Sequence, residues 1–174
     1  MAWTTPRTWA TNDSLSASTL NIHLRDNLSF LYGAPRCRVH NSAAQTLTTA
    51  TFTAITMNSE RFDNDSLHST VTNTARITFA TAGVYLVGGA LEFVANSTGV
   101  RGAFLRINGT TYISGGIHMT RTDGGGAGEF TATIYSFAVS DYVELMGYQN
   151  SGGNLDTVVD VNQAPEFWAV FQGN

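Results

Sequence analysis

The sequence predicts an all-β domain of the sandwich or barrel type, preceded by an N-terminal arm and a single helix. Three observations lead to this prediction. The 174 residues include 24 Thr and 17 Gly, a composition typical of β-strands joined by many turns. From residue 36 onward, apolar residues alternate or form short runs between turn residues. Only one segment has a helical period, and the length suits one ordinary domain.

The first 15 residues are rich in Thr and have no sustained period, so we expect an extended arm. The arm carries Trp3 and Trp9. Two tryptophans on an arm are costly to expose, which predicts that they dock against a surface.

Residues 16–31 (SASTLNIHLRDNLSFL) are expected to form the helix, capped by Ser16 or Ser18 and ended by Gly33. Its leucines recur on one side and form a leucine stripe, namely Leu20, Leu24, Leu28 and Leu31. A helix this short is marginal alone, so the stripe must pack on something. Its own domain, sister chains and another protein remain open alternatives.

Ten strands are expected after the helix, and the polar segment 58–74 between two of them is expected to be a long loop. The predicted strands are 36–41, 46–57, 75–80, 83–95, 101–107, 111–119, 128–138, 141–149, 156–161 and 166–172.

Several of these strands are apolar on both faces, most clearly 83–95, 130–139 and 141–149. In a monomeric sandwich the outer face of each sheet contacts water, so apolar and polar residues alternate along its strands. Because no other helix is available to cover such faces, we expect other copies of the chain to do so. The low content of charged residues, 13%, favours the same interpretation.

Composition excludes several functions. All nine basic residues are Arg, which excludes chemistry that needs a lysine, such as a P-loop or a Schiff base. The net charge of −4 argues against binding to nucleic acid. A single Cys excludes a disulfide framework, and no apolar run is long enough to span a membrane. The N-terminus also lacks a secretory signal pattern, so we expect synthesis and folding in a cytosol.

No catalytic or metal-binding constellation is evident, so we expect a protein that is not an enzyme and holds no cofactor and no metal. The four histidines lack ligand spacing, and Cys37 is expected in the core. The Asp63–Asp65 segment is similar to part of a calcium loop, but the Gly and Glu that the loop needs are missing. Loops 96–99, 122–128 and 149–154 are candidates for sugar binding, with Tyr148 and Asn150 as test positions.

Four segments carry a resemblance to a known family: ITFATAGVYLV (77–87), LRINGTT (105–111), VSDYVELM (139–146) and EFWAVF (166–171). In order and spacing they resemble the jelly-roll domain shared by the complement 1q head and tumour necrosis factor. Ser140 and Ala169 stand where that family has Gly. The resemblance implies a ten-stranded jelly-roll sandwich over residues 36–174 that assembles as a threefold homotrimer. It places these residues at the trimer interface: Leu86, Gly88, Met146, Tyr148 and Phe167.

The N-terminal segment, TWAT followed by SASTLNIHLRDNL, resembles the opening of small bacteriophage structural proteins. This implies a virion surface protein made in the host bacterial cytoplasm, either a capsid decoration or a short head fibre. Residues 1–35 then anchor it to a major capsid or tail protein. The anchoring candidates are Trp3, Trp9, Leu20, Leu24, Leu28 and Leu31. The alternative is a tail-tip or tail-fibre adhesin that binds host surface glycans.

Overall fold

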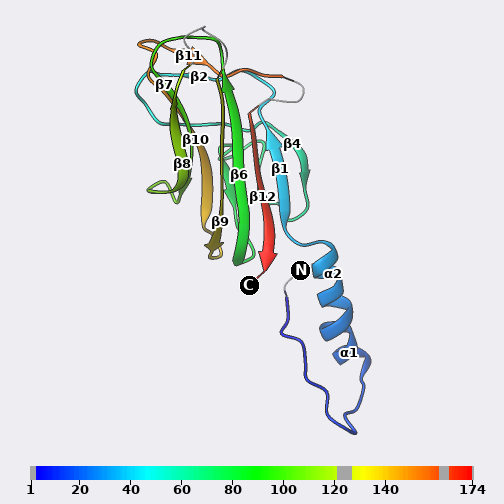
Figure 1. Ribbon diagram of the computed structural model, residues 1–174. Coiled ribbons are helices and arrows are strands. Elements are labelled where there is room, and N and C mark those ends of the chain that lie inside the picture. Colours follow the sequence, from blue (N-terminus) through cyan, green and yellow to red (C-terminus); the bar gives the residue numbers. More distant parts are fainter. Residues whose placement is uncertain (1–2, 121–126, 161–164, 174) are drawn as a thin grey trace. The chain divides into compact units, whose positions relative to one another are not determined.

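A computed structural model describes residues 3–120, 127–160 and 165–173. The chain divides into two compact units, Met1–Ala34 and Pro35–Asn174 (Figure 1). Among the described residues, no helix is both long and apolar enough to cross a bilayer.

The N-terminal unit contains one continuous helical segment at the position of the predicted helix. It consists of α1 (Ala17–Leu20), the π-helical turn η1 (Asn21–Asp26) and α2 (Asn27–Tyr32). The predicted cap is confirmed at Ser16, whose Oγ accepts a hydrogen bond from Thr19 N at 3.1 Å. Gly33 follows the last turn, as expected from the sequence.

The arm docks on this helix through a polar and an aromatic contact. Asn27 is buried and exchanges two hydrogen bonds with the backbone of Thr4, at 3.0 and 2.7 Å. The rings of Trp3 and Phe30 lie 6.1 Å apart. Trp9 instead stays partly exposed, with the Arg7 guanidinium 4.8 Å from its ring centroid.

The arm therefore covers the side of the helix that carries Asn27 and Phe30, and not the leucine stripe. Leu24, Leu28 and Leu31 are 49%, 64% and 61% exposed, while Leu20 is half-buried. The expectation that the stripe finds a partner is not met within this unit.

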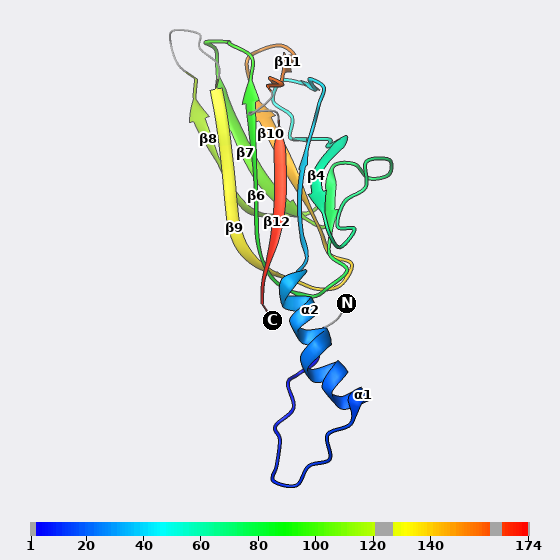
Figure 2. The same cartoon turned by 90° about the vertical axis from the view of Figure 1, so that its right-hand side faces the viewer.

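The second unit is an antiparallel sandwich of two five-stranded sheets (Figures 1 and 2). The first sheet has the order β4-β1-β12-β6-β9, and its strands are β4 (Ser59–Asp63), β1 (Arg36–His40), β12 (Glu166–Gly173), β6 (Gly83–Phe93) and β9 (Ala127–Phe137). The second has the order β3-β10-β7-β8, with β5 also paired to β10; its strands are β3 (Thr53–Ala54), β10 (Tyr142–Gln149), β7 (Val100–Ile107), β8 (Thr111–Met119) and β5 (Arg76–Thr78). A separate short ladder joins β2 (Thr46–Leu47) to β11 (Leu155–Asp156).

The predicted all-β sandwich is therefore confirmed, with corrections to three segments. The run 46–57 contains two short strands, β2 and β3. The expected loop 58–74 contains β4, an edge strand whose side chains are mostly exposed and, apart from Phe62, polar. The strand expected at 156–161 is limited to β11, and residue 161 lies outside the described residues.

Aromatic and aliphatic side chains from both sheets fill the space between them. Phe79 stacks on Phe137 with ring centroids 3.9 Å apart and lies 4.5 Å from Tyr85. The Tyr85 hydroxyl donates to the Thr81 carbonyl at 2.8 Å, which satisfies the one polar group of that side chain. The core thus fixes which side of each strand faces outward.

Cys37 belongs to this core, as the sequence predicts, and it is fully buried. Burial, with Asp63 nearby, raises the pKa of its thiol well above the usual range. We expect no reaction with a thiol-specific reagent at pH 8 in the native protein, and one equivalent after unfolding in urea. Native labelling as fast as labelling in urea contradicts this placement.

Candidate self-association surface

The outward side of the first sheet is apolar along three neighbouring strands. On β6 and β12 the core residues Val87 and Phe167 alternate with residues that point away from the core. We call the outward set the apolar face; it consists of Leu86, Phe130, Ile134, Trp168 and Val170. Phe130 and Ile134 are 65% and 64% exposed, and Leu86 is 36% exposed.

The members of the apolar face are contiguous. Leu86 pairs in register with Val170 on one side and Ile134 on the other. The rings of Phe130 and Trp168 lie 5.7 Å apart across the β6 strand between them. Contiguous apolar surface of this kind marks an interaction site in a folded protein.

Gly88 lies under the indole of Trp168. A Cβ atom at this position falls 2.6 Å from Trp168 Cζ2 and 2.9 Å from Ala132 Cβ. Glycine at this position therefore lets the indole of Trp168 lie close against the backbone of β6.

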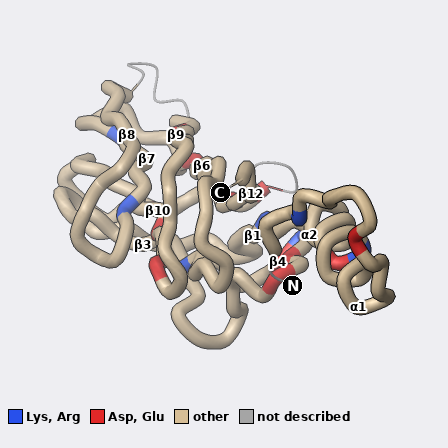
Figure 3. Tube along the Cα trace, turned by 90° about the horizontal axis from the view of Figure 1, so that it is seen from below, with Lys and Arg blue, Asp and Glu red and all other residues tan. Residues whose placement is uncertain are grey.

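A charged network borders the apolar face on β1 and β4. The buried Glu166 carboxylate accepts hydrogen bonds from Arg38 Nε at 2.6 Å and from Arg61 Nε. Burial and the neighbouring Arg61 lower the pKa of His40, which is paired in register with Glu166. Charged positions are otherwise sparse along the trace (Figure 3), so this network is a distinct polar margin.

The five residues predicted at the trimer interface lie in different places. Leu86 and Gly88 are on the outward side of β6, at the apolar face. Phe167 is 0% exposed in the core and Met146 is 1% exposed within a single protomer, so neither presents a side chain to a neighbour. These two positions are corrections to the predicted interface.

Tyr148 belongs to the other sheet, where it joins a separate aromatic cluster of Phe52, Phe104, Tyr112 and Tyr148. The Tyr148 ring centroid is 4.7 Å from that of Phe52. These rings pack mainly on one another, and Phe104 lies against Gly102 and Gly115. Phe130, Ile134 and Trp168 are not among the residues predicted at the interface, although the sequence of 130–134 places apolar residues on both sides of the strand.

The candidates for metal and sugar binding have structural partners. The Asp63 carboxylate accepts hydrogen bonds from the backbone N–H groups of Asp65, Leu67 and His68. It shapes a turn, and the described residues contain no cluster of His, Cys, Asp and Glu suited to a metal ion. Asn150 Oδ1 accepts from Val100 N at 2.6 Å and ties two loops together. Most of loop 122–128 lies outside the described residues.

Arg101 is the largest fully buried side chain that carries a charge in the described chain. Its guanidinium donates to the carbonyl oxygens of Asn96, Thr98 and Val100, and it lies 5.8 Å from the Phe93 ring centroid. Burial lowers its pKa, and Glu129 opposes that effect. Arg101 therefore holds the connection between β6 and β7 and has a structural role.

Comparisons with known proteins identify the fold. No model of a known protein family matches the chain, and no curated protein matches it in sequence. Murine APRIL at pH 5.0 is structurally similar, with a TM-score of 0.63, 10% identity, and coverage of 79% of this chain and 98% of APRIL. Eiger TNF from S. frugiperda gives 0.60 at 14% identity, covering 80% and 92%. The globular domain of zebrafish complement 1qA gives 0.56 at 14% identity, covering 80% and 99%. These likenesses show the jelly-roll fold of tumour necrosis factor and complement 1q.

Proposed function

We propose that this protein is a non-enzymatic, homotrimeric surface protein of a bacteriophage particle, a capsid decoration or a short head fibre. The observation that carries the proposal is the apolar face on the first sheet. Its side chains are exposed in a single protomer, and burying them against other copies removes this apolar area from water. We therefore assign the apolar face to contacts between copies of the chain.

The apolar surface also continues at the edge of the sandwich. Strand β9 is one edge of the first sheet, and β8 is one edge of the second. Beside Phe130 and Ile134 of β9, strand β8 exposes Ile117 and Met119. An edge of one copy against the face of the next is a head-to-tail contact, which closes into a ring when the rotation is right. A threefold ring agrees with the trimer that the family resemblance implies.

The N-terminal unit supplies the proposed attachment to the particle. Its arm is already fastened to the helix through Asn27, while the leucine stripe remains open. An open stripe on an ordered helix fits an apolar groove on another protein. We assign that groove to a major capsid or tail protein, in keeping with the resemblance of this segment to phage structural proteins.

Deleting residues 1–34 is expected to abolish attachment to the particle and to leave a folded β domain, because the two units are separately compact. Attachment is measured by co-sedimentation with particles that lack the native protein, and folding by circular dichroism. A finer variant changes Leu24, Leu28 and Leu31 to Ser, with exposed Asn21 and Arg25 changed to Ala as the control. Full attachment of the deleted protein contradicts the anchoring role.

A second candidate function is recognition of a host surface glycan at the phage tail. The observation that favours it is a polar cavity in the connection between β4 and β5. Both functions use the same trimeric domain, and they differ in whether that cavity is occupied.

A further inference from the structure

A cavity of about 160 Å³ lies in the connection between β4 and β5 and at the start of β5. Hydroxyl, amide and guanidinium groups dominate its lining, and no Asp or Glu contributes to it. The polar lining residues are Ser66, His68, Ser69, Thr72, Asn73, Arg76 and Thr78. A lining of this kind suits a small ligand with several hydroxyl groups and no positive charge.

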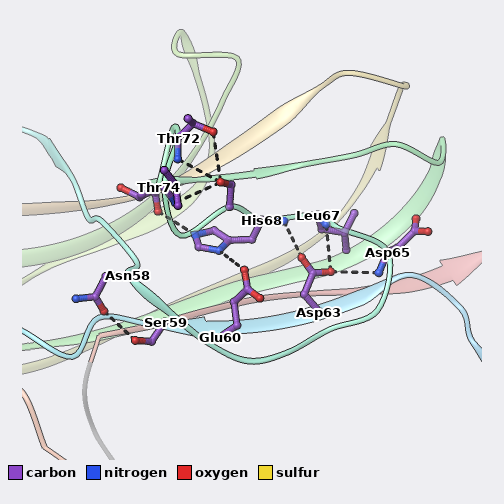
Figure 4. A network of polar contacts seen from close by, with 11 residues as sticks. Asn58, Ser59, Glu60, Asp63, Asp65, Leu67, His68, Thr72 and Thr74 are labelled. Atoms are coloured by element: carbon purple, nitrogen blue, oxygen red, sulfur yellow. Dashed lines mark hydrogen bonds and ion pairs between the residues drawn. The ribbon is translucent and has the colours of Figure 1, made fainter.

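Hydrogen bonds of His68 and Asp63 fix the conformation of the loop that forms the cavity. The His68 side chain is fully buried between Glu60 Oε1, 3.0 Å from its Nδ1, and the Thr74 carbonyl oxygen, 3.1 Å from its Nε2 (Figure 4). The Glu60 carboxylate and the Thr74 carbonyl thus hold the imidazole ring from two sides. Asp63 fixes the start of the loop, and Thr78 N donates to Leu67 O at 2.7 Å.

Two lining residues have left-handed backbone conformations. Ser66 and Asn73 have φ angles of 53° and 51°; serine enters this region at a cost, whereas asparagine adopts it more readily. Strain of this kind persists where the surrounding structure imposes it, and it is concentrated at functional sites. The loop is thus ordered in one shape before any ligand arrives.

Arg76 gives the cavity its positive charge. Its Nε donates to Glu144 at 3.2 Å, and its guanidinium lies 4.0 Å from the Tyr142 ring centroid. The same carboxylate accepts two hydrogen bonds from Arg106, at 3.0 and 2.8 Å, so two cations share one anion. In the described part of the chain, the Nη groups of Arg76 make no hydrogen bond, which leaves them for a ligand.

We propose that this cavity binds a single acidic sugar ring, of the hexuronate type, from a surface polysaccharide. Arg76 binds the carboxylate, and the Ser69, Thr72 and Asn73 side chains bind ring hydroxyls. The volume is well below that of a site for a drug-sized molecule and suits one ring. The proposal deepens the second candidate function, but it concerns a site on each protomer and depends neither on the particle nor on the trimer.

The test is a titration of the full-length protein with glucuronic acid, followed by saturation-transfer difference NMR and calorimetry. Glucose and inorganic phosphate serve as comparison probes. We expect a Kd on the order of 1 mM for glucuronic acid, as befits one small ring. Binding by glucose should be weaker by about tenfold or more, because it lacks the charged contact.

Arg76→Gln should reduce glucuronate binding by about tenfold or more, through loss of a charged hydrogen bond. Arg106→Gln is the comparison variant, because it removes the other partner of Glu144 without changing a cavity residue. It should reduce binding clearly less than Arg76→Gln, since the guanidinium that contacts the ligand remains. Asn73→Gly, which keeps the left-handed backbone, should weaken binding without unfolding the loop.

Four outcomes overturn the proposal: no binding of glucuronate, equal binding of glucose, equal competition by phosphate, or equal losses in the Arg76 and Arg106 variants. Because the assay uses free protein, its failure leaves attachment to particles untouched. Failure of the attachment experiment likewise leaves this binding measurement intact.

Discussion

Ile134→Asp is expected to convert the trimer into folded monomers. Ile134 is 64% exposed in the protomer, so a carboxylate there remains in water when the protomer is alone. In the proposed trimer it is buried without a partner at three equivalent sites, and an uncompensated buried charge costs about 3–5 kcal/mol. Sedimentation at micromolar concentration should show three times 18.7 kDa for the wild type and 18.7 kDa for the variant.

Val139→Asp provides the control for this experiment. Val139 is 59% exposed and follows β9 in the turn toward β10, so the same change in chemistry occurs away from the apolar face. We expect this variant to remain trimeric, with an unchanged far-ultraviolet spectrum. A wild-type protein that sediments as a monomer contradicts the proposed assembly.

Phe167→Ala is expected to lower the free energy of unfolding of the protomer by about 3–5 kcal/mol, the usual cost of emptying a buried aromatic site. Phe167 is fully buried in the core between the sheets. The measurement is urea unfolding monitored by tryptophan fluorescence, carried out in the Ile134→Asp background so that assembly does not contribute.

Leu86→Ala separates the core role from the surface role. Leu86 is one-third exposed on the apolar face, so its truncation should weaken assembly and change the unfolding free energy of the protomer much less than Phe167→Ala does. Equal destabilisation by the two variants is incompatible with Phe167 inside and Leu86 outside.

The sequence predicted the sandwich and the presence of two-faced apolar strands, but it did not establish which side of β12 faces inward. Phe167 and Trp168 are adjacent aromatic residues, and a strand places them on opposite faces. Both are compatible with a core and with an interface. The neighbouring strand β6 decides which of the two side chains faces the core. Its Gly88 pairs with Trp168 and leaves room for the indole on the outward side, and this pairing exists only in the folded sheet.

The helix shows the same boundary between local and long-range information. Its start at Ser16 and its end before Gly33 follow from local hydrogen bonding and backbone freedom, and both agree with the sequence analysis. The side of the helix that packs against the arm cannot be predicted in this way. It depends on Asn27, a polar residue that bonds with the backbone of Thr4, 23 positions earlier in the chain. Apolar periodicity carries no signal for such a contact.

The candidate sugar site was equally hidden. Segment 58–74 is mostly polar and carries only Phe62, Leu67 and Val71 as large apolar residues, so strand β4 has no apolar alternation to identify it. The link from His68 to Glu60 and Thr74 requires the loop to fold back over the edge of the sandwich. Neither the buried histidine nor the left-handed conformations of Ser66 and Asn73 are encoded by a recognisable local motif.

The central place of β12 in its sheet has a consequence for synthesis on the ribosome. Strand β12 lies between β1 and β6, so each of them lacks one hydrogen-bonded neighbour until residues 166–173 have been synthesised. A nascent chain paused before this point exposes the unpaired backbone edges of β1 and of the longer β6, and such edges favour intermolecular pairing. We therefore anticipate that premature termination upstream of β12 yields insoluble material instead of a shortened domain.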